Sequence, residues 1–412
     1  MFKSISVIGL GYIGIPTSVF FAKTGLQVVG VDINENIVNQ LNSGYLTILE
    51  PNLENLLKQV VDMNKFRATT KPETTDAYII AVPTPFKENH EPDLKYIKSA
   101  AKSISNCLQR GNLIVLESTS PVGTTESLAQ WLQELRPDLN ILNDDVEKDV
   151  FVAYCPERMI PGNVFELVEN DRIVGGINEE STYKAKELYS LISEGELLLT
   201  DSKTAEMSKL TENSFRDVNI AFANELSIIC EKKNINVHKL IEIANHHPRV
   251  NILQPGCGVG GHCIAVDPWF IVSSDRENSK LISTARIVND FKPKFVVQKV
   301  EDIVNILGKN NPTICCFGAS FKPNIDDLRE SPALKICEEL SSKYKNVLLV
   351  EPNIREIPDN LKKNNVKLVS LDYGIKADII VPLVKHKDFL GIKPKFLKKQ
   401  CIVDVLGVWC DE

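Results

Sequence analysis

The sequence predicts an α/β protein with two Rossmann-like parallel-sheet domains joined by a long central helix. Three observations support this fold class. A short apolar strand, the glycine-rich turn Gly9–Gly14 and a helical stretch open the chain. Residues 204–232 contain neither glycine nor proline, which favours one long helix. A second series of strands and helices begins near Pro312. Because 412 residues exceed the usual size of one domain, we expect domains at residues 1–200, 201–300 and 301–412.

The first domain begins with a strand, a turn, a helix and a second strand. Residues 5–8 form the first strand, Gly9–Gly14 (GLGYIG) follows at once, and Gly25 ends the helix. Residues 27–31 form the next strand, with Asp32 at its end. In this setting the glycines allow a tight turn, a close approach to a pyrophosphate and close helix packing. Since Asp32 would bind ribose hydroxyls and repel a 2′-phosphate, we expect NAD rather than NADP.

Further strands of this domain are expected at residues 76–82, 113–117 and 149–154. Thr84 and Thr119 stand in the loops that follow the first two of them. Loops at the carboxyl ends of parallel strands face the ligand crevice, which makes both threonines candidate contacts for cofactor or substrate. Threonine is equally expected in turns and at helix caps. The local sequence leaves these two interpretations open.

Composition limits the partners and the compartment. The net charge of −7 and the sequence pI near 5.6 argue against a nucleic-acid-binding protein. The ten cysteines contain no CxxC pair, and we expect a reducing cytoplasm. Residues 4–22 carry no charge and resemble a signal peptide or a membrane span, but three glycines and Pro16 interrupt them. We therefore expect no membrane association.

The glycine–cysteine loop, residues 256–267, is the most unusual segment. Four glycines closely precede Cys263, and Asp267 follows it. Because glycine permits close approach and positive φ, this setting favours a thiol that faces a ligand rather than a core. A nucleophilic thiol beside a nicotinamide cofactor can hold an aldehyde covalently while it is oxidised to an acid. His246 and His247 have no third ligand at useful spacing, so we expect no metal.

Three polar residues are aligned on the expected central helix. Lys209, Asn213 and Arg216 stand at positions i, i+4 and i+7 and therefore share one face. Their alignment on a helix otherwise suited to packing suggests a site. A solvated face with ion pairs from Glu206 to Lys209 or from Glu212 to Arg216 is the alternative. The helix is also a candidate dimerisation element.

The last domain is expected to have strands at residues 313–317, 347–350, 378–383 and 401–405. It has no second GxGxxG sequence, which indicates a Rossmann-like domain without a dinucleotide of its own. Lys322 and Arg329 stand in a loop between a strand and a helix, where they could meet phosphates.

Seven motifs, taken in order, resemble the nucleotide-sugar 6-dehydrogenases, the family of UDP-glucose dehydrogenase. They are GLGYIG, STSPVGTT (118–125), CPER (155–158), AEMSKLTENSFRDVN (205–219), HPRVN (247–251), GVGGHCIAVDPW (258–269) and FKPNIDDLRESP (321–332). The resemblance covers nearly the whole chain. Residues 209–225 are most similar to the branch that acts on N-acetylhexosamines. This implies UDP-N-acetyl-D-mannosamine as substrate, with UDP-N-acetylglucosamine or UDP-glucose as alternatives.

The resemblance also implies roles for the residues at matching positions. Catalysis is implied for Cys263 as nucleophile, and for Lys209, Asn213, Glu157, Asp267 and Thr119. Cofactor binding is implied for Gly9, Gly11, Tyr12, Ile13, Gly14, Asp32, Thr84, Thr119 and Arg329. Substrate binding is implied for Arg158, Met159, Lys209, Asn213, Arg216, His247, Arg249, Gly260, Phe321 and Lys322.

The implied reaction oxidises the C6 hydroxyl to a carboxylate with two NAD, through a thiohemiacetal and a thioester on Cys263. Lys209 or His262 could favour the thiolate form of this cysteine. Cys257 could form a regulatory disulfide, although a small packed residue is the favoured interpretation. The product would serve surface polysaccharide synthesis, and the enzyme is expected to be a homodimer or a higher homo-oligomer.

Two other functions are weighed against this one. A two-electron dehydrogenase of the β-hydroxyacid type shares a Rossmann domain and a helical lysine, but its chemistry needs neither Cys263 nor a second α/β domain. A catalytically silent NAD-sensing protein does not account for the complete set of reactive residues.

Overall fold

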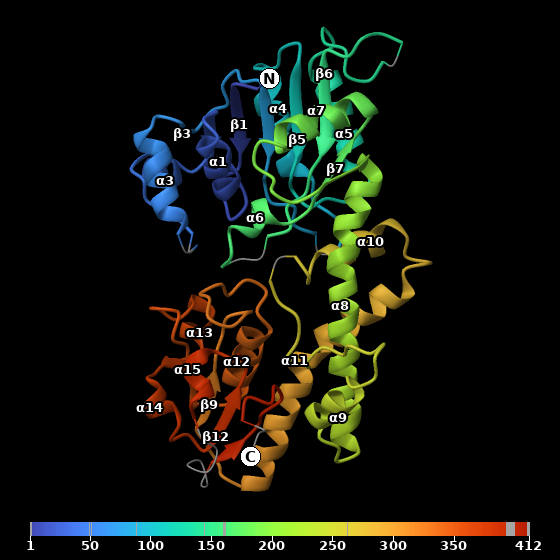
Figure 1. Ribbon diagram of the computed structural model, residues 1–412. Helices are drawn as coiled ribbons and strands as arrows, with labels where there is room; N and C mark the ends of the chain where they lie inside the picture. The colour runs from blue at the N-terminus through green and yellow to red at the C-terminus, as the bar shows by residue number, and fades with distance from the viewer. Residues whose placement is uncertain are drawn as a thin grey trace. The chain divides into compact units, whose positions relative to one another are not determined.

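The computed structural model describes residues 2–48, 50, 52–87, 89–143, 145–159, 162–261, 263–392 and 400–409. His262 and Cys410 lie outside the described residues. The chain divides into two compact units, residues 1–211 and 212–412. Helix α8 (Ser202–Lys232) begins in the first unit and ends in the second, as the sequence predicts (Figure 1).

The first unit is built on an eight-stranded sheet with the order β3-β2-β1-β4-β5-β6-β7-β8. Its strands are β1 (Ser4–Ile8), β2 (Gln27–Val31), β3 (Phe66–Thr69), β4 (Ala77–Ile80), β5 (Asn112–Leu116), β6 (Val150–Tyr154), β7 (Arg172–Gly176) and β8 (Leu197–Asp201). The five pairings from β3 to β6 are all parallel, which confirms the predicted α/β class. β7 runs antiparallel to β6, and β8 is parallel to β7.

The antiparallel junction follows from its connection. A parallel neighbour needs a crossover, usually through a packed helix. Among the described residues between β6 and β7, the one helix is the four-residue α6 (Glu166–Glu169), and β7 runs back along the sheet. The sequence analysis did not anticipate this reversal.

Helices cover both faces of the first sheet (Figure 1). The helices are α1 (Gly14–Lys23), α2 (Glu35–Asn42), α3 (Leu53–Asp62), α4 (Lys95–Ser105), α5 (Thr124–Leu135) and α7 (Glu179–Tyr189). One apolar core joins the sheet to α1, α3 and α7, and a second joins it to α4 and α5. Alternate residues of β1 enter the two cores, with Ile5 and Val7 on one face and Ile8 on the other. Because β1, β4 and β5 are parallel neighbours, the loops that follow them meet at the carboxyl edge of the sheet.

The second unit contains a parallel five-stranded sheet with the order β11-β10-β9-β12-β13. Its strands are β9 (Ile314–Phe317), β10 (Val347–Val350), β11 (Lys367–Leu368), β12 (Ile379–Pro382) and β13 (Cys401–Ile402). Its helices, apart from the end of α8, are α9 (Val237–Ala244), α10 (Asp267–Ser274), α11 (Lys280–Leu307), α12 (Pro332–Lys343), α13 (Asp359–Lys363), α14 (Leu371–Gly374) and α15 (Lys387–Leu390).

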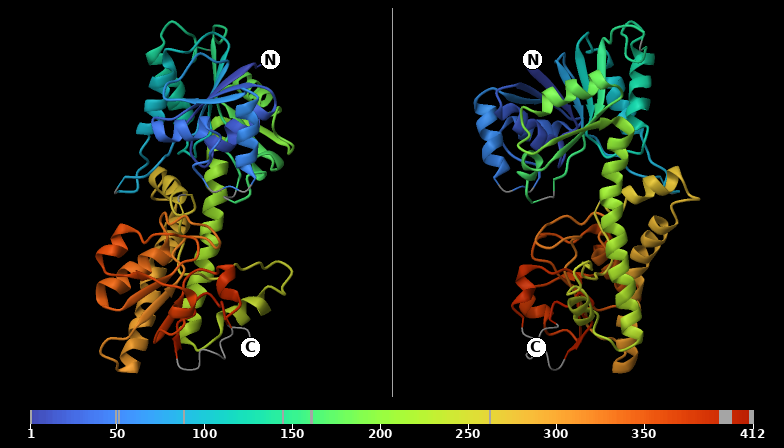
Figure 2. Two further views of the ribbon diagram at one scale, coloured as in Figure 1. Left: turned by 90° about the vertical axis from the view of Figure 1, so that its left-hand side faces the viewer. Right: turned by 45° about the vertical axis from the view of Figure 1, so that its right-hand side comes forward.

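Helices α8 and α11 lie side by side in the second unit, as the yellow-green and orange ribbons of Figure 2 show. Buried polar pairs join them. Arg286 donates to Asp217 at 2.7 Å, and Asn224 donates to Asn289 at 2.8 Å. These pairs fix the register between the helix that carries Asn213 and the helix that packs on the second sheet.

No described helix combines the length and the apolar character that crossing a membrane requires. The uncharged stretch near the amino terminus forms β1, the glycine turn and most of α1.

Candidate active site

The glycine turn after β1 has the geometry of a dinucleotide cradle. Gly9 has a φ of +99°, and a Cβ on it would lie 2.5 Å from the carbonyl oxygen of Ala81. A Cβ on Gly14 would lie 1.8 Å from the carbonyl oxygen of Gly9. The Cα of Gly11 faces open space, since a Cβ there would meet no atom within 4 Å. Two glycines are thus required by packing, and the third leaves backbone accessible to a ligand.

Asp32 holds this turn from the end of β2. Its carboxylate accepts hydrogen bonds from the backbone N–H of Leu10 at 3.0 Å and from that of Asn34 at 2.9 Å. The side chain is only partly buried, so it can still meet ribose hydroxyls. The turn, this carboxylate and the amino end of α1 fit the pyrophosphate and ribose of NAD.

Glu206 joins the loop after β5 to helix α8. Its buried carboxylate accepts hydrogen bonds from Gly123 N–H at 2.6 Å, Thr125 N–H at 2.7 Å and Thr125 Oγ1 at 2.6 Å. The Thr84 hydroxyl, in the loop after β4, donates at 2.5 Å to the carbonyl of Thr119 in the loop after β5. Burial raises the pKa of Glu206 to about 7, against the opposing effect of these donors. Sequence reasoning named Glu206 only as an ion-pair partner and missed its cap on α5.

Lys209 follows Glu206 by three residues and contacts Glu157. Its ammonium donates to the Glu157 carbonyl at 2.6 Å and lies 3.5 Å from the Glu157 carboxylate. Both residues are 7% exposed. Glu157 also accepts a hydrogen bond from Met159 N–H, and Arg158 donates to the Asp171 carbonyl at 3.0 Å. The structure thus brings together the predicted lysine and glutamate in the first unit.

A buried ion pair lies beneath the loops that follow β5 and β6. Arg172 donates to Glu117 at 2.9 Å, and both side chains are almost fully buried. Glu117 also accepts a hydrogen bond from Thr17 at 3.0 Å. Arg172 further contacts the Cys155 carbonyl at 3.4 Å and lies over the ring of Tyr189. The pair therefore ties the end of β5 to the start of the Glu157 loop.

A second group of predicted residues meets in the second unit. The Asn213 amide donates to the Asp267 carboxylate at 2.5 Å. Asp267 is the first residue of α10, and its N–H donates to the Cys263 carbonyl at 2.8 Å. Cys263 is partly exposed, whereas Asp267 is 3% exposed. Asp267 thus links two segments: its N–H holds the Cys263 carbonyl, and its carboxylate holds the α8 residue Asn213.

The glycines of the glycine–cysteine loop make room for the chain itself. A Cβ on Gly260 would lie 2.8 Å from Phe321, and one on Gly261, whose φ is +80°, would lie 2.9 Å from the Phe321 ring. Gly261 N–H donates to the Arg329 carbonyl at 3.1 Å. At the other end, Gly256 N–H donates to Asn224 at 2.8 Å. The loop is therefore held between α8 and the loop that follows β9.

Cys257 is packed rather than presented. It is 5% exposed, and its thiol donates to the Leu383 carbonyl at 3.3 Å. Burial raises its pKa to about 12, which leaves it as an inert thiol. The interpretation as a small packed residue agrees with this position.

Other predicted binding residues lie on the surface of the second unit. The side chains of Arg216, His247 and Arg249 are exposed. The His247 ring accepts a hydrogen bond from Arg249 N–H at 3.3 Å. Arg329, predicted to reach the cofactor, contacts the Asp327 carboxylate at 2.6 Å.

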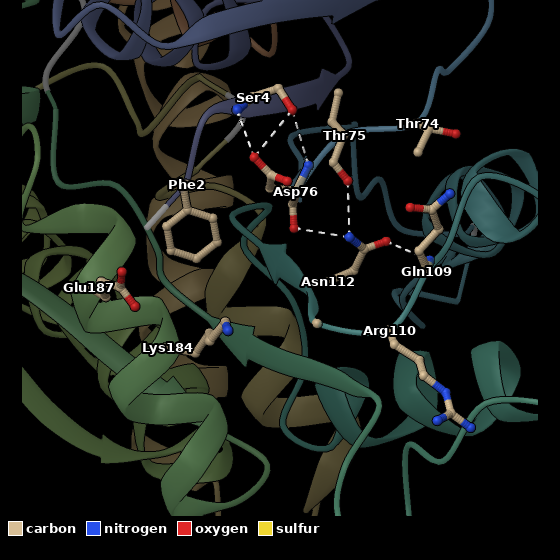
Figure 3. Close-up of a pocket in the computed structure, with 11 residues that line it drawn as sticks. Phe2, Ser4, Thr74, Thr75, Asp76, Gln109, Arg110, Asn112, Lys184 and Glu187 are labelled. Atoms are coloured by element: carbon tan, nitrogen blue, oxygen red, sulfur yellow. Dashed lines mark hydrogen bonds between the residues drawn. The ribbon is translucent and has the colours of Figure 1, made fainter.

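One pocket of about 260 Å³ lies in the first unit. Figure 3 shows Asp76, which accepts hydrogen bonds from Ser4, beside Asn112. Ser4 and Asn112 begin β1 and β5, and Asp76 directly precedes β4, so the pocket lies at the amino edge of the sheet. Because Gly9–Gly14 follows the carboxyl end of β1, this pocket is not the cofactor site. Among the described residues, no group of three His, Cys, Asp or Glu side chains could hold a metal.

Comparison with known proteins covers almost the whole chain. Residues 3–193 match the NAD binding domain of the UDP-glucose/GDP-mannose dehydrogenase family, residues 203–291 its central domain and residues 315–411 its UDP binding domain. The first match confirms the predicted NAD cofactor.

Individual relatives agree with these matches. The UDP-N-acetyl-D-mannosamine dehydrogenase of Campylobacter jejuni is 56% identical over 399 residues, 95% of this chain and 97% of that protein. The NDP-N-acetyl-D-galactosaminuronic acid dehydrogenase of Ralstonia nicotianae is 51% identical over 412 residues, 99% of this chain and 96% of that protein. A solved UDP-D-ManNAc dehydrogenase from Pyrococcus horikoshii superimposes with a TM-score of 0.90 at 37% identity, covering 98% of this chain and 96% of its own. The protein is therefore an NAD-dependent dehydrogenase that belongs to the UDP-glucose/GDP-mannose dehydrogenase family.

Proposed function

We propose that this enzyme oxidises the C6 hydroxyl of UDP-N-acetyl-D-mannosamine to a carboxylate, giving UDP-N-acetyl-D-mannosaminuronate for surface polysaccharide synthesis. The observation that carries the four-electron part is the partly exposed Cys263, whose backbone is tied to Asp267 and Asn213. The choice of sugar is supported by the UDP-N-acetyl-D-mannosamine dehydrogenase of Campylobacter jejuni, to which this chain is similar. The similarity to the NDP-N-acetyl-D-galactosaminuronic acid dehydrogenase of Ralstonia nicotianae makes an N-acetyl-D-galactosamine sugar a second candidate.

NAD would be held by the Gly9–Gly14 turn, the amino end of α1 and Asp32. When bound, it accepts a hydride from C6 in each of the two oxidations. In the proposal, Thr84 and Thr119 shape the nicotinamide side of this site, supported by the hydrogen bond between them.

The side chains of the chain supply the remaining chemistry. Lys209 stabilises negative charge on the C6 oxygen while the hydroxyl proton leaves to water or a carboxylate. The Cys263 thiolate adds to the resulting aldehyde and forms a thiohemiacetal. After the second oxidation, water attacks the thioester, with Glu157 or Asp267 accepting the proton, and the thiolate leaves. The balance is one alcohol, two NAD and one water giving one carboxylate, two NADH and three protons.

We propose that the chain has the three predicted domains and that the third binds the UDP moiety. Phe321 and Lys322 would contact it there, and the basic residues Arg158, Arg216, His247 and Arg249 would favour its diphosphate. The close packing of the glycine–cysteine loop on Phe321 supports a shared role for the two segments. The ten cysteines suit a cytoplasmic enzyme.

We further propose a homodimer or a higher homo-oligomer formed through α8. Phe215, Phe222 and Ile229 recur at intervals of seven residues on this helix and are 68%, 54% and 48% exposed. Ile287 and Phe291 on the adjacent α11 are also exposed. An apolar stripe of this kind is suited to pairing with a second copy.

The test is the NADH yield per sugar consumed, measured with UDP-N-acetylmannosamine, UDP-N-acetylgalactosamine, UDP-N-acetylglucosamine and UDP-glucose. Two NADH per sugar with the first compound alone support the whole proposal. One NADH per sugar contradicts the four-electron mechanism and supports the alternative of a two-electron dehydrogenase. Cys263→Ser should bind NAD and UDP normally but fail to complete the second oxidation. Full two-step turnover in that variant contradicts the thioester route.

A further inference from the structure

The second sheet repeats the backbone geometry of the cofactor turn. Its central strands have the order β10-β9-β12, as the first sheet has β2-β1-β4. Gly318 follows β9 with a φ of +97°, close to the +99° of Gly9. Gly318 N–H donates to the Val350 carbonyl at 2.8 Å, and Gly9 N–H donates to the Val31 carbonyl at the same distance. The first turn of each sheet is therefore built in the same way.

The acid at the end of the second strand is also repeated, but its environment differs. Asp32 accepts one N–H from the residue after Gly9, and Glu351 accepts one from Ala319, the residue after Gly318, at 2.7 Å. Asp32 is partly exposed, whereas the Glu351 side chain is fully buried. In the second sheet the acid is therefore closed to a ribose.

Glu351 is instead saturated by protein donors. One carboxylate oxygen accepts from the N–H groups of Ala319 and Ser320 and lies 3.1 Å from His386 Nε2. The other accepts from the N–H of Asn353 at 3.0 Å and from its side-chain amide. Burial alone would raise the pKa of Glu351, but the hydrogen bonds from His386 and Ala319 outweigh it and lower the pKa. The carboxylate is the stable form.

These contacts fix the role of each nitrogen of His386. The ring is fully buried and follows β12. Its Nε2 faces the Glu351 carboxylate and therefore carries the proton. Its Nδ1 receives Asn324 N–H at 3.0 Å and the Asn353 amide at 3.1 Å, and therefore acts as an acceptor. The ring also lies 3.3 Å from the Ser320 hydroxyl, which donates to the Lys322 carbonyl at 2.8 Å.

We propose that His386 is a positioning residue for nucleoside diphosphate binding, because its Nδ1 fixes the Asn324 end of the loop 320–324 while its Nε2 holds the ring against Glu351. That loop carries Phe321 and Lys322, so the inference rests on their proposed role in binding UDP. In a dinucleotide-binding domain the acid at this position binds ribose. Here His386 binds that acid, Glu351, and this contact holds the ring where it shapes a site for a mononucleotide. Glu351 serves as its anchor and makes no ligand contact.

Two isosteric substitutions separate the functions of the two nitrogens. His386→Asn keeps an acceptor near the Nδ1 position, and His386→Gln keeps a donor near the Nε2 position. UDP binding to the full-length protein is measured by calorimetry, with the exposed His246→Gln as the matched control. Because His386→Gln leaves the Asn324 N–H without its buried acceptor, we expect UDP to bind about tenfold more weakly. The UDP affinity of His386→Asn and of His246→Gln should stay within about threefold of the wild-type affinity. The first variant keeps an acceptor for Asn324 N–H, and the second leaves His386 unchanged.

Steady-state kinetics gives a second readout. His386→Gln should raise KM for the UDP-sugar and leave kcat unchanged, because the lost contact serves binding alone. If His386→Gln does not fold, Ser320→Ala, which removes the bond to Lys322, should weaken UDP binding in the same direction. Unchanged UDP affinity in either folded variant, or equal losses in His386→Asn and His386→Gln, would overturn the proposal. A failure of the proposed sugar oxidation with intact UDP binding would overturn the function and leave this inference standing.

Discussion

Replacing Glu206 with glutamine tests how a buried carboxylate supports the site. The side chain accepts three hydrogen bonds at the start of α5 and is fully buried. Glutamine keeps the shape and one acceptor oxygen but turns the other oxygen into a donor. That donor meets either Gly123 N–H or Thr125 N–H, so one hydrogen bond is lost at a cost of about 1–3 kcal/mol. The charge, however, is also removed.

The change in charge makes the outcome depend on pH. The pKa of Glu206 is raised from 4.5 to about 7, mainly by burial. A shift of 2.5 units corresponds to about 3 kcal/mol. This contribution to folding is fully present below the unfolded pKa and is lost as the pH rises through the folded value. About 2 kcal/mol of this contribution to stability is lost between about pH 5.5 and 8.5. Glu206→Gln lacks this dependence, so its stability relative to the wild type should improve by that amount as pH rises.

Trp131 provides the assay because it lies on α5 itself. Replacing Trp269 and Trp409, which belong to the second unit, with phenylalanine makes its fluorescence specific to the first unit. Urea unfolding is then followed at several pH values for the wild type, Glu206→Gln and the exposed control Glu126→Gln. A stability difference that stays constant within about 0.5 kcal/mol would refute the reasoning and show that the three donors keep the carboxylate ionised throughout.

Three other substitutions test the buried pairs and the apolar stripe. Arg172→Met should destabilise the first unit by about 3–5 kcal/mol in urea unfolding, because it leaves Glu117 buried and unpaired. The double variant with Glu117→Gln should recover part of the loss, and an additive loss would contradict a direct pair. Burial lowers the pKa of Lys292 to about 8, so Lys292→Met should stabilise the second unit by about 1–2 kcal/mol near neutral pH. This gain should disappear above about pH 10, where the unfolded lysine also loses its proton, and a gain independent of pH would count against it. Phe222→Glu should shift the sedimentation coefficient towards the monomer, and an unchanged value would exclude this part of α8 from the interface.

The sequence predicted the parts of the fold that leave a local pattern. Gly9–Gly14 marks the cofactor turn because the tight turn demands glycine within a few residues, and β2 begins and ends at the expected residues. The reversal at β7 left no such pattern, because an apolar strand does not record its direction. The long helix was predicted from the absence of glycine and proline, and it extends two residues further at its start.

Residues that support the site by holding the backbone of other segments were missed for a related reason. Glu206 acts on a helix end more than 80 residues earlier in the chain, so its spacing to Lys209 looked like a surface ion pair. Asn224 and His386 likewise act on backbone N–H groups that any sequence provides. A carboxylate, an amide or a histidine at an otherwise apolar, buried position is the signal that would have found them.

The position of Glu206 and Lys209 on one helix also limits how this chain can vary in length. They stand three positions apart, which is a rise of about 4.5 Å along α8. One extra residue inserted there would rotate Lys209 by about 100° away from Glu157 while the cap on α5 stayed in place. Substitutions at the intervening positions leave the angle between Glu206 and Lys209 around the helix axis unchanged. Insertions and deletions in homologues should therefore avoid this turn of the helix and collect in loops such as residues 137–143.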